Sequence, residues 1–123
     1  MPHYKMVVLS NPFPGREAEC DEWYRHQHLQ DVVALPGFIA AQRFHLQHPI
    51  QEPNPYRFMA IYDIESDDIR QTLGGLVTAA EQGTLVVSDA LDTENAYAVV
   101  YEASGEPVLT LTAKKCQPQK SSP

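Results

Sequence analysis

The sequence predicts an α+β fold in which a four-stranded antiparallel sheet carries two helices on one face. The first observation behind this prediction is the order of segments along the 123 residues, which reads strand, helix, strand, strand, helix, strand. The second is that the strand segments are apolar on both sides, so both faces of the sheet are expected to be covered. This order of elements is typical of the ferredoxin-like split βαβ arrangement.

The first half of the chain supplies a strand, a long helix and a second strand. Residues 4–9 are mostly apolar, and a proline-rich turn follows them. A helix is predicted over residues 16–35, because acidic residues crowd its first turns and Pro36-Gly37 ends it. Residues 38–46 alternate as a strand. Its two faces are expected to carry Phe38, Ala40, Gln42, Phe44 and Leu46 on one side and Ile39, Ala41, Arg43 and His45 on the other.

The second half repeats the pattern of strand, helix and strand. After a loop that contains three prolines, residues 56–64 are predicted to form the third strand. Residues 67–82 carry an apolar stripe at helical spacing and are predicted to form the second helix. Residues 95–102 are predicted to form the fourth strand, which completes the sheet.

One domain accounts for most of the chain, because 123 residues fit a single domain of ordinary size. We expect this α+β domain to span residues 1–106 and a C-terminal extension to span residues 107–123. Within the extension, residues 108–112 are predicted to add a short strand. The polar residues that follow are predicted to form a disordered tail.

Composition excludes several classes of partner. Nine basic against sixteen acidic residues give a net charge of −7, which argues against nucleic acid and against an anionic membrane surface. Cys20 and Cys116 form neither a disulfide framework nor a zinc pattern, so we expect two reduced thiols. No signal peptide opens the chain, and its first apolar run is too short to span a bilayer. These features predict a cytoplasmic protein.

The helix-free face of the sheet is expected to be an interface between two copies of the chain. Both sides of the strands over residues 56–64 and 95–102 carry apolar side chains. A sheet face exposed to water would alternate with polar residues instead. A two-fold homodimer is the simplest arrangement that covers such a face.

The first helix carries polar residues on the side that should meet the sheet. At 100° per residue, one arc holds Cys20, Trp23, Tyr24, Ala34 and Leu35. Gln27 and Asp31 fall near the middle of that arc, and His28 falls at its edge. Buried carboxylates are costly without partners, so this polar trio predicts a wet cavity between the helix and the sheet.

His28 and Asp31 are candidate catalytic residues. They lie three residues apart, so their side chains can touch on one helix face. A carboxylate would fix the imidazole tautomer and raise its pKa, which suits a general acid or base. The alternative is an ordinary structural pair. Trp23 and Tyr24 are likewise either walls of a ligand pocket or part of the core.

Other residues give weaker indications. Arg43 could bind an acidic ligand or form a salt bridge. His26 and His28 point to opposite sides of a helix, and no local spacing assembles His45, His48 and His3, so no metal site is predicted. Cys20 has no activating cation beside it in the sequence, which disfavours a nucleophilic role. The absence of a glycine-rich phosphate loop and of a G-x-S-x-G elbow argues against nucleotide binding and serine hydrolase chemistry.

Several motifs together resemble the EthD-like family of dimeric α+β barrel proteins. The similarity covers about residues 4–102, and Gln30 departs from it where related sequences often carry proline. The motifs that carry it are Ser10-Asn11-Pro12 with Gly15, Trp23-Tyr24, His28-Leu29-Gln30-Asp31-Val32, Pro36-Gly37-Phe38, Arg43-Phe44, Ala60-Ile61-Tyr62-Asp63-Ile64-Glu65 and Ser88-Asp89-Ala90-Leu91.

The resemblance implies a ferredoxin-like monomer that pairs into a barrel through its sheets. Related barrels include cofactor-free oxygenases of aromatic polyketides, polyketide cyclases and dehydratases, lactone isomerases and haem-degrading enzymes. The family's histidine near the end of the first helix corresponds to His28, where it often lines the cavity between helix and sheet. The fold alone does not name a reaction.

Three functions follow as hypotheses. The first is binding of a small aromatic or polyketide-like molecule, or its turnover as by a cofactor-independent oxygenase, isomerase or dehydratase, with His28 and Asp31 as catalytic residues. Its substrate-binding residues would be Trp23, Tyr24, Gln27, Arg43 and Tyr62. No cofactor is required. The alternative is a non-catalytic homodimer that binds a ligand or supports a pathway, and a haem-binding variant is the third hypothesis.

Overall fold

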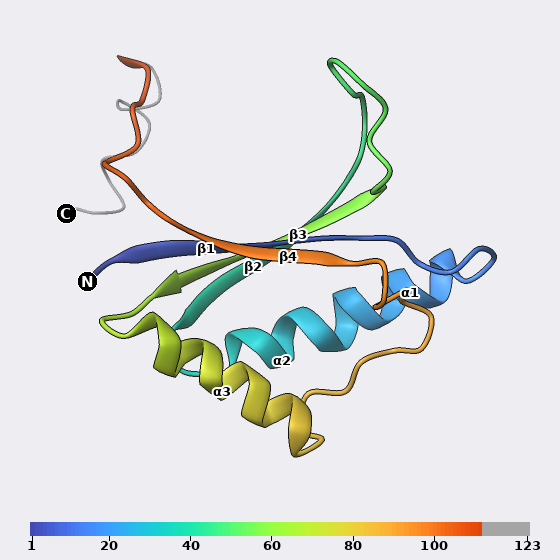
Figure 1. The fold of residues 1–123 in the computed structure, drawn as a ribbon, viewed down its shortest axis with the longest axis horizontal. Coiled ribbons are helices and arrows are strands. Elements are labelled where there is room, and N and C mark those ends of the chain that lie inside the picture. Colours follow the sequence, from blue (N-terminus) through green and yellow to red (C-terminus); the bar gives the residue numbers. More distant parts are fainter. Residues whose placement is uncertain (112–123) are drawn as a thin grey trace.

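The computed structural model describes residues 1–111. They form a four-stranded antiparallel sheet with its helices beneath one face (Figure 1). Along the sheet the strand order is β2-β3-β1-β4, as in a ferredoxin-like fold, which confirms the predicted class. In chain order the elements are β1 (His3–Ser10), α1 (Glu17–Trp23), η1 (Tyr24–His28), α2 (Leu29–Val33), β2 (Phe38–His45), β3 (Phe58–Glu65), α3 (Ile69–Glu81) and β4 (Tyr97–Glu102).

The first helix is one continuous rod made of α1, η1 and α2, and it lies close to its predicted bounds. It ends where the sequence indicated, because Gly37 has a φ of 90°, which favours glycine. A Cβ at this position would also lie 2.8 Å from the Cγ2 of Thr72, at the start of α3. The helix end is therefore fixed by both local conformation and packing against the second helix.

The middle of this helix is a π-helical turn, η1, which no feature of the sequence pattern indicates. Its signature is the backbone N–H of Leu29, which donates to the carbonyl of Tyr24, five residues earlier. Each residue in such a wider turn advances by less than 100° around the axis. The predicted position of Gln27 on the buried face is therefore wrong: its side chain is exposed, while His28 rotates inward.

A bulge in β2 changes the predicted faces of this strand. The register with β3 shifts between Phe38 and Ala40, so the extra residue moves Phe38 to the opposite side. Phe38 pairs with Ile64 and is buried in the core between the sheet and the helices, whereas Ile39 is exposed. The prediction that Phe38 shares a face with Ala40 is wrong for this reason.

The core fills the space between the sheet and the helices. Its most enclosed side chains include Tyr62 and Ile64 of β3, Val32 of α2 and Cys20 of α1. Cys20 is a free thiol, and burial raises its pKa. In the C-terminal extension, residues 108–111 form no strand, which corrects that prediction. Cys116, the tail and the end of the predicted strand lie outside the described residues.

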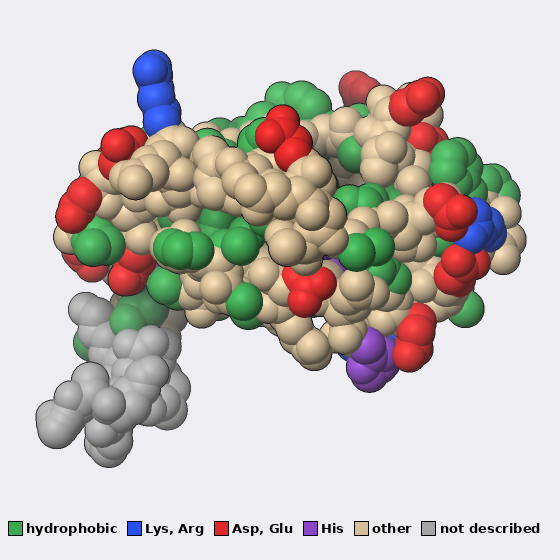
Figure 2. Space-filling model, turned by 90° about the horizontal axis from the view of Figure 1, so that it is seen from below, with side chains coloured by type: hydrophobic (Ala, Val, Ile, Leu, Met, Phe, Trp, Pro, Cys, Tyr) green, Lys and Arg blue, Asp and Glu red, His purple; other side chains and the backbone are tan. Residues whose placement is uncertain are grey.

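The helix-free face of the sheet remains uncovered in a single chain. Its neighbouring strands place apolar side chains side by side, with a Lys5–Asp63 ion pair among them. The larger exposed or half-buried apolar residues on this face are Val7, Leu9, Phe44, Met59, Ile61, Tyr97, Val99 and Tyr101. On the opposite side, acidic side chains spread over the helices with few basic ones between them (Figure 2).

Candidate functional site

His28 lies among three aromatic rings beneath the sheet. It stacks on Trp23 with ring centroids 4.5 Å apart and an angle of 27° between the ring planes. Tyr24 and Tyr62 meet it edge-on, with centroids at 5.2 and 6.2 Å. The indole N–H of Trp23 donates to the carbonyl of Val86 at 2.9 Å, which fixes this ring against the segment after α3. The imidazole is therefore held by packing.

The imidazole of His28 is electrostatically unusual. Burial lowers its pKa to about 4, and the nearby carboxylate of Asp31 opposes this shift without cancelling it. The buried Nδ1 atom has no hydrogen-bond partner, so Asp31 does not orient the ring through Nδ1. Asp31 raises the pKa as expected, but burial lowers it by more, so the net shift is downward. At neutral pH His28 is an uncharged base with a free, buried nitrogen.

This low pKa predicts a loss of stability in mild acid. An unfolded chain takes up the His28 proton near pH 6.5, and the folded chain only near pH 4. The contribution is present above pH 6.5 and is lost as the pH falls towards 4. The free energy of unfolding should therefore be lower by roughly 2 kcal/mol at pH 5 than at pH 7.

Urea denaturation of wild type, His28→Gln and the exposed control His26→Gln at both pH values would measure this contribution. Only His28→Gln should reduce the difference between the two pH values. An equal difference in all three proteins would contradict the low pKa of His28.

A chain of hydroxyl groups lies beside this histidine. Tyr24 and Tyr62 hydrogen-bond to each other, and Tyr24 also bonds to Ser10 at the end of β1. Burial raises the pKa of both tyrosines, so both stay protonated at neutral pH. Ser10 is buried and was not singled out as a site residue by sequence. The only indication of Ser10 in the sequence is a single hydroxyl residue at the end of an apolar strand.

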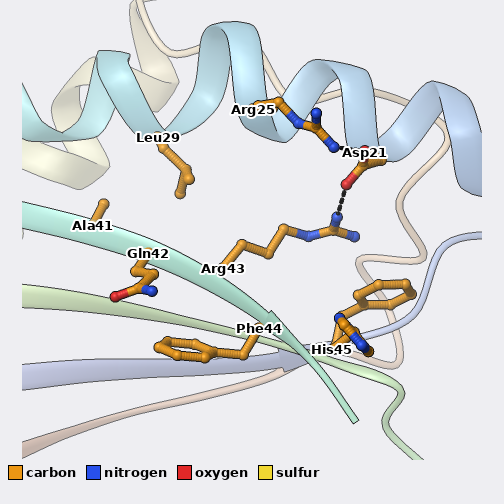
Figure 3. Close-up of a pocket in the computed structure, with 9 residues that line it drawn as sticks. Asp21, Arg25, Leu29, Ala41, Gln42, Arg43, Phe44 and His45 are labelled. Atoms are coloured by element: carbon orange, nitrogen blue, oxygen red, sulfur yellow. Dashed lines mark hydrogen bonds and ion pairs between the residues drawn. The ribbon is translucent and has the colours of Figure 1, made fainter. Parts of the chain in front are cut away.

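An open cleft of about 370 Å³ separates the first helix from the edge strand β2 (Figure 3). Figure 3 shows Asp21, Arg25 and Leu29 reaching into it from the helix, and Ala41 and Arg43 from the strand. The walls combine charged and apolar side chains. They are formed by Asp21, Arg25, Leu29, Ala41, Gln42, Arg43, Phe44, His45 and Phe58.

Arg43 is the central polar group of this cleft. Its guanidinium carbon lies 4.5 Å from the ring centre of Tyr24 and 4.1 Å from that of Phe58. Its Nη1 donates to Asp21 Oδ1 at 2.6 Å, and Arg25 Nη2 donates to Asp21 Oδ2 at 2.5 Å. The buried Nε has no partner. One carboxylate thus bridges two guanidinium groups.

The predicted site residues lie in two neighbouring regions, which are the packed interior around His28 and the open cleft. Trp23 and Tyr62 surround His28 in the closed interior, whereas Arg43 lines the open cleft, which His28 does not line. The ring of Tyr24 contacts both His28 and Arg43 and so lies between these two regions. Asp31 is half-buried, and Gln27 is exposed to solvent. Neither residue is part of the aromatic cluster around His28 or of the cleft walls.

Asp21 and Arg25 are cleft residues that sequence reasoning missed. Their spacing of four residues on a helix was the available signal, since such pairs can form ion pairs. Within residues 1–111, no group of three or more His, Cys, Asp or Glu side chains could hold a metal ion. None of the helices in this range is long and apolar enough to cross a membrane.

Comparisons with known proteins support the fold. No protein-family model and no curated protein matches this chain. A solved structure from Bacillus halodurans, described as an EthD family protein, aligns with a TM-score of 0.54 at 12% identity over 88% of this chain and 100% of its own. Another solved structure, from Shewanella loihica and provisionally described as a monooxygenase, aligns with a TM-score of 0.51 at 16% identity. This alignment covers 89% of this chain and 99% of the other. The EthD-like fold inferred from sequence motifs is thereby confirmed.

Proposed function

We propose that this protein binds a small, largely aromatic molecule between its first helix and its sheet, where His28 takes or gives a proton without a cofactor. The observation that carries the proposal is the buried, unpartnered Nδ1 of His28. Buried polar atoms in native proteins are nearly always hydrogen-bonded, so an exception calls for a water, a ligand or a catalytic role. The surrounding rings favour an aromatic ligand.

His28 is available as a proton acceptor. Its pKa of about 4 keeps the imidazole neutral throughout the physiological range, and the same low pKa makes it a weaker base than a histidine in water. When the imidazole becomes charged, Asp31 is the nearby group that favours the cation. The ligand would enter through the open cleft, and its reacting part would pass the ring of Tyr24 to reach His28.

The structural neighbours are compatible with this role. One is described as an EthD family protein and the other, provisionally, as a monooxygenase. Cofactor-independent oxygenation, isomerisation and dehydration share a step in which a base removes a proton from carbon. A single placed base is enough for that step.

Deuterium exchange into a carbon acid tests the proposal directly. The bicyclic ketone 2-tetralone, an aromatic ring beside an acidic C–H bond, would be incubated with the protein in D2O and followed by proton NMR. Exchange faster than in buffer with the same amount of heat-unfolded protein would support proton transfer. Exchange at the buffer rate, with binding visible as line broadening, would instead support the second function below.

A non-catalytic ligand-binding or accessory role is the second candidate. The observation that favours it is the packing of His28 against three rings, outside the walls of the open cleft. An imidazole in this position can serve the core alone. This candidate predicts that ligands bind the cleft while 2-tetralone exchanges at the buffer rate both in wild type and in His28→Gln.

A homodimer through the helix-free face is part of the proposal. Tyr101 is 64% exposed on that face beside other apolar residues, and Val77 is 55% exposed on the helix side. Sedimentation velocity at micromolar concentration should show a dimer for wild type and for Val77→Glu. Tyr101→Glu should be monomeric, because it would bury a charge in the interface. A monomeric wild type would overturn this arrangement.

A further inference from the structure

The ion pairs in the open cleft contain more positive than negative charge. Arg25 and Arg43 contribute two positive charges and Asp21 one negative charge, so the cleft holds a net positive charge in a protein whose total is −7. An acidic protein repels anions in general, but a local excess of arginine attracts anions to the cleft. The ligand chemistry that fits such a cleft is anionic.

The two ends of the central ion pair differ in their exposure. The side chain of Arg43 is 11% exposed, whereas that of Asp21 is 43% exposed. A nearly buried guanidinium needs an anion at all times, because an uncompensated buried charge is costly. Asp21 can return to water at little cost, since exposed ion pairs contribute little. Another anion can therefore replace Asp21 on Arg43.

The shape and remaining walls of the cleft indicate what carries this anion. Asp21 bridges two guanidinium groups with its two oxygen atoms, which is a geometry that carboxylates adopt. Beside this pair, Leu29 and Phe58 supply an apolar wall. The volume of about 370 Å³ lies within the range of small-ligand pockets.

We propose that this cleft binds an aromatic carboxylate, whose carboxylate replaces Asp21 on Arg43 while its ring packs against Leu29 and Phe58. Asp21 is then a built-in competitor that keeps Arg43 paired when the ligand is absent. The inference rests on the proposed function for the presence of an aromatic ligand and adds the charge of that ligand.

Isothermal titration calorimetry with two isosteric probes tests this inference. The probes are 1-naphthoate and its neutral analogue 1-naphthamide, titrated into the full chain at pH 7 and low salt. The carboxylate should bind about tenfold tighter than the amide, as expected for an added charge-assisted hydrogen bond. Arg43→Met should remove this preference. The control Arg70→Gln should keep it, since Arg70 is exposed on α3 and does not line the cleft.

The variant Asp21→Asn separates the inference from a purely structural ion pair. Removal of the competitor should tighten 1-naphthoate by about 30-fold or more, because the ligand no longer has to displace Asp21 from Arg43, and leave 1-naphthamide unchanged. Weaker binding of 1-naphthoate would show that Asp21 supports the site and would overturn the exchange. Equal affinity of the two probes for wild type would overturn the acidic ligand class and leave a neutral aromatic ligand in place. Failure of both probes to bind at millimolar concentration would overturn the cleft as the ligand site, whereas the deuterium exchange assay reports on His28 independently.

Discussion

Replacement of His28 with glutamine is expected to slow deuterium exchange into 2-tetralone by about 10²–10⁴-fold, the usual contribution of one placed general base. Glutamine can fill much of the space between Trp23 and Tyr62, but its amide cannot take up a proton at neutral pH. Ligand affinity should change little, because the walls of the open cleft do not include His28. Proton NMR of the exchanging position measures the rate, and calorimetry measures the affinity.

The pH profile of this exchange carries additional information. Because the pKa of His28 is about 4, the base stays neutral and the rate should stay level from pH 8 down to about 5. A histidine in water would lose half of its activity near pH 6.5. The exposed control His26→Gln should match wild type at every pH. A profile that falls near pH 6.5, or full activity of His28→Gln, would assign the proton transfer to another group.

The fold could be predicted from sequence because its signals are local. Pro36-Gly37 ends the first helix through the conformation of Gly37 itself, and the strands show as apolar runs between turns. The π-helical turn has no comparable signal. It differs from an α-helix by one backbone hydrogen bond, from Leu29 to Tyr24, and the inward rotation of His28 follows from that bond. The projection at 100° per residue therefore misplaced Gln27.

The site was predicted in part for the same reason. Trp23, Tyr24 and Tyr62 were recognised because aromatic residues on a buried face are visible in the pattern, and they do surround His28. Asp21 was not recognised, because acidic residues in the first turns of a helix are usually solvated and stabilise the helix dipole. Its partner Arg43 lies 22 residues away on a strand, and only the packing of the helix on β2 brings them together.

Replacement of Asp21 with asparagine is expected to lower the free energy of unfolding by about 2–3 kcal/mol. This is below the 3–5 kcal/mol typical of a fully buried pair, because Asp21 itself is 43% exposed. The loss arises at Arg43, which keeps its charge against the rings of Tyr24 and Phe58 with no carboxylate beside it. Urea denaturation at pH 7 measures the effect.

The double variant Asp21→Asn/Arg43→Met identifies the cause of that loss. If the unpaired guanidinium destabilises the protein, removing it should restore most of the stability, since methionine fills a similar volume without charge. Glu22→Gln, which neutralises the neighbouring carboxylate at a position that is 74% exposed, should change the stability by less than about 0.5 kcal/mol. A double variant no more stable than Asp21→Asn alone would show that Arg43 does not depend on an anion. If Arg43 does depend on an anion, it pairs with Asp21 when no ligand is bound and can exchange Asp21 for the carboxylate of a ligand. The stability measurement and the binding measurement therefore test the same property of Arg43.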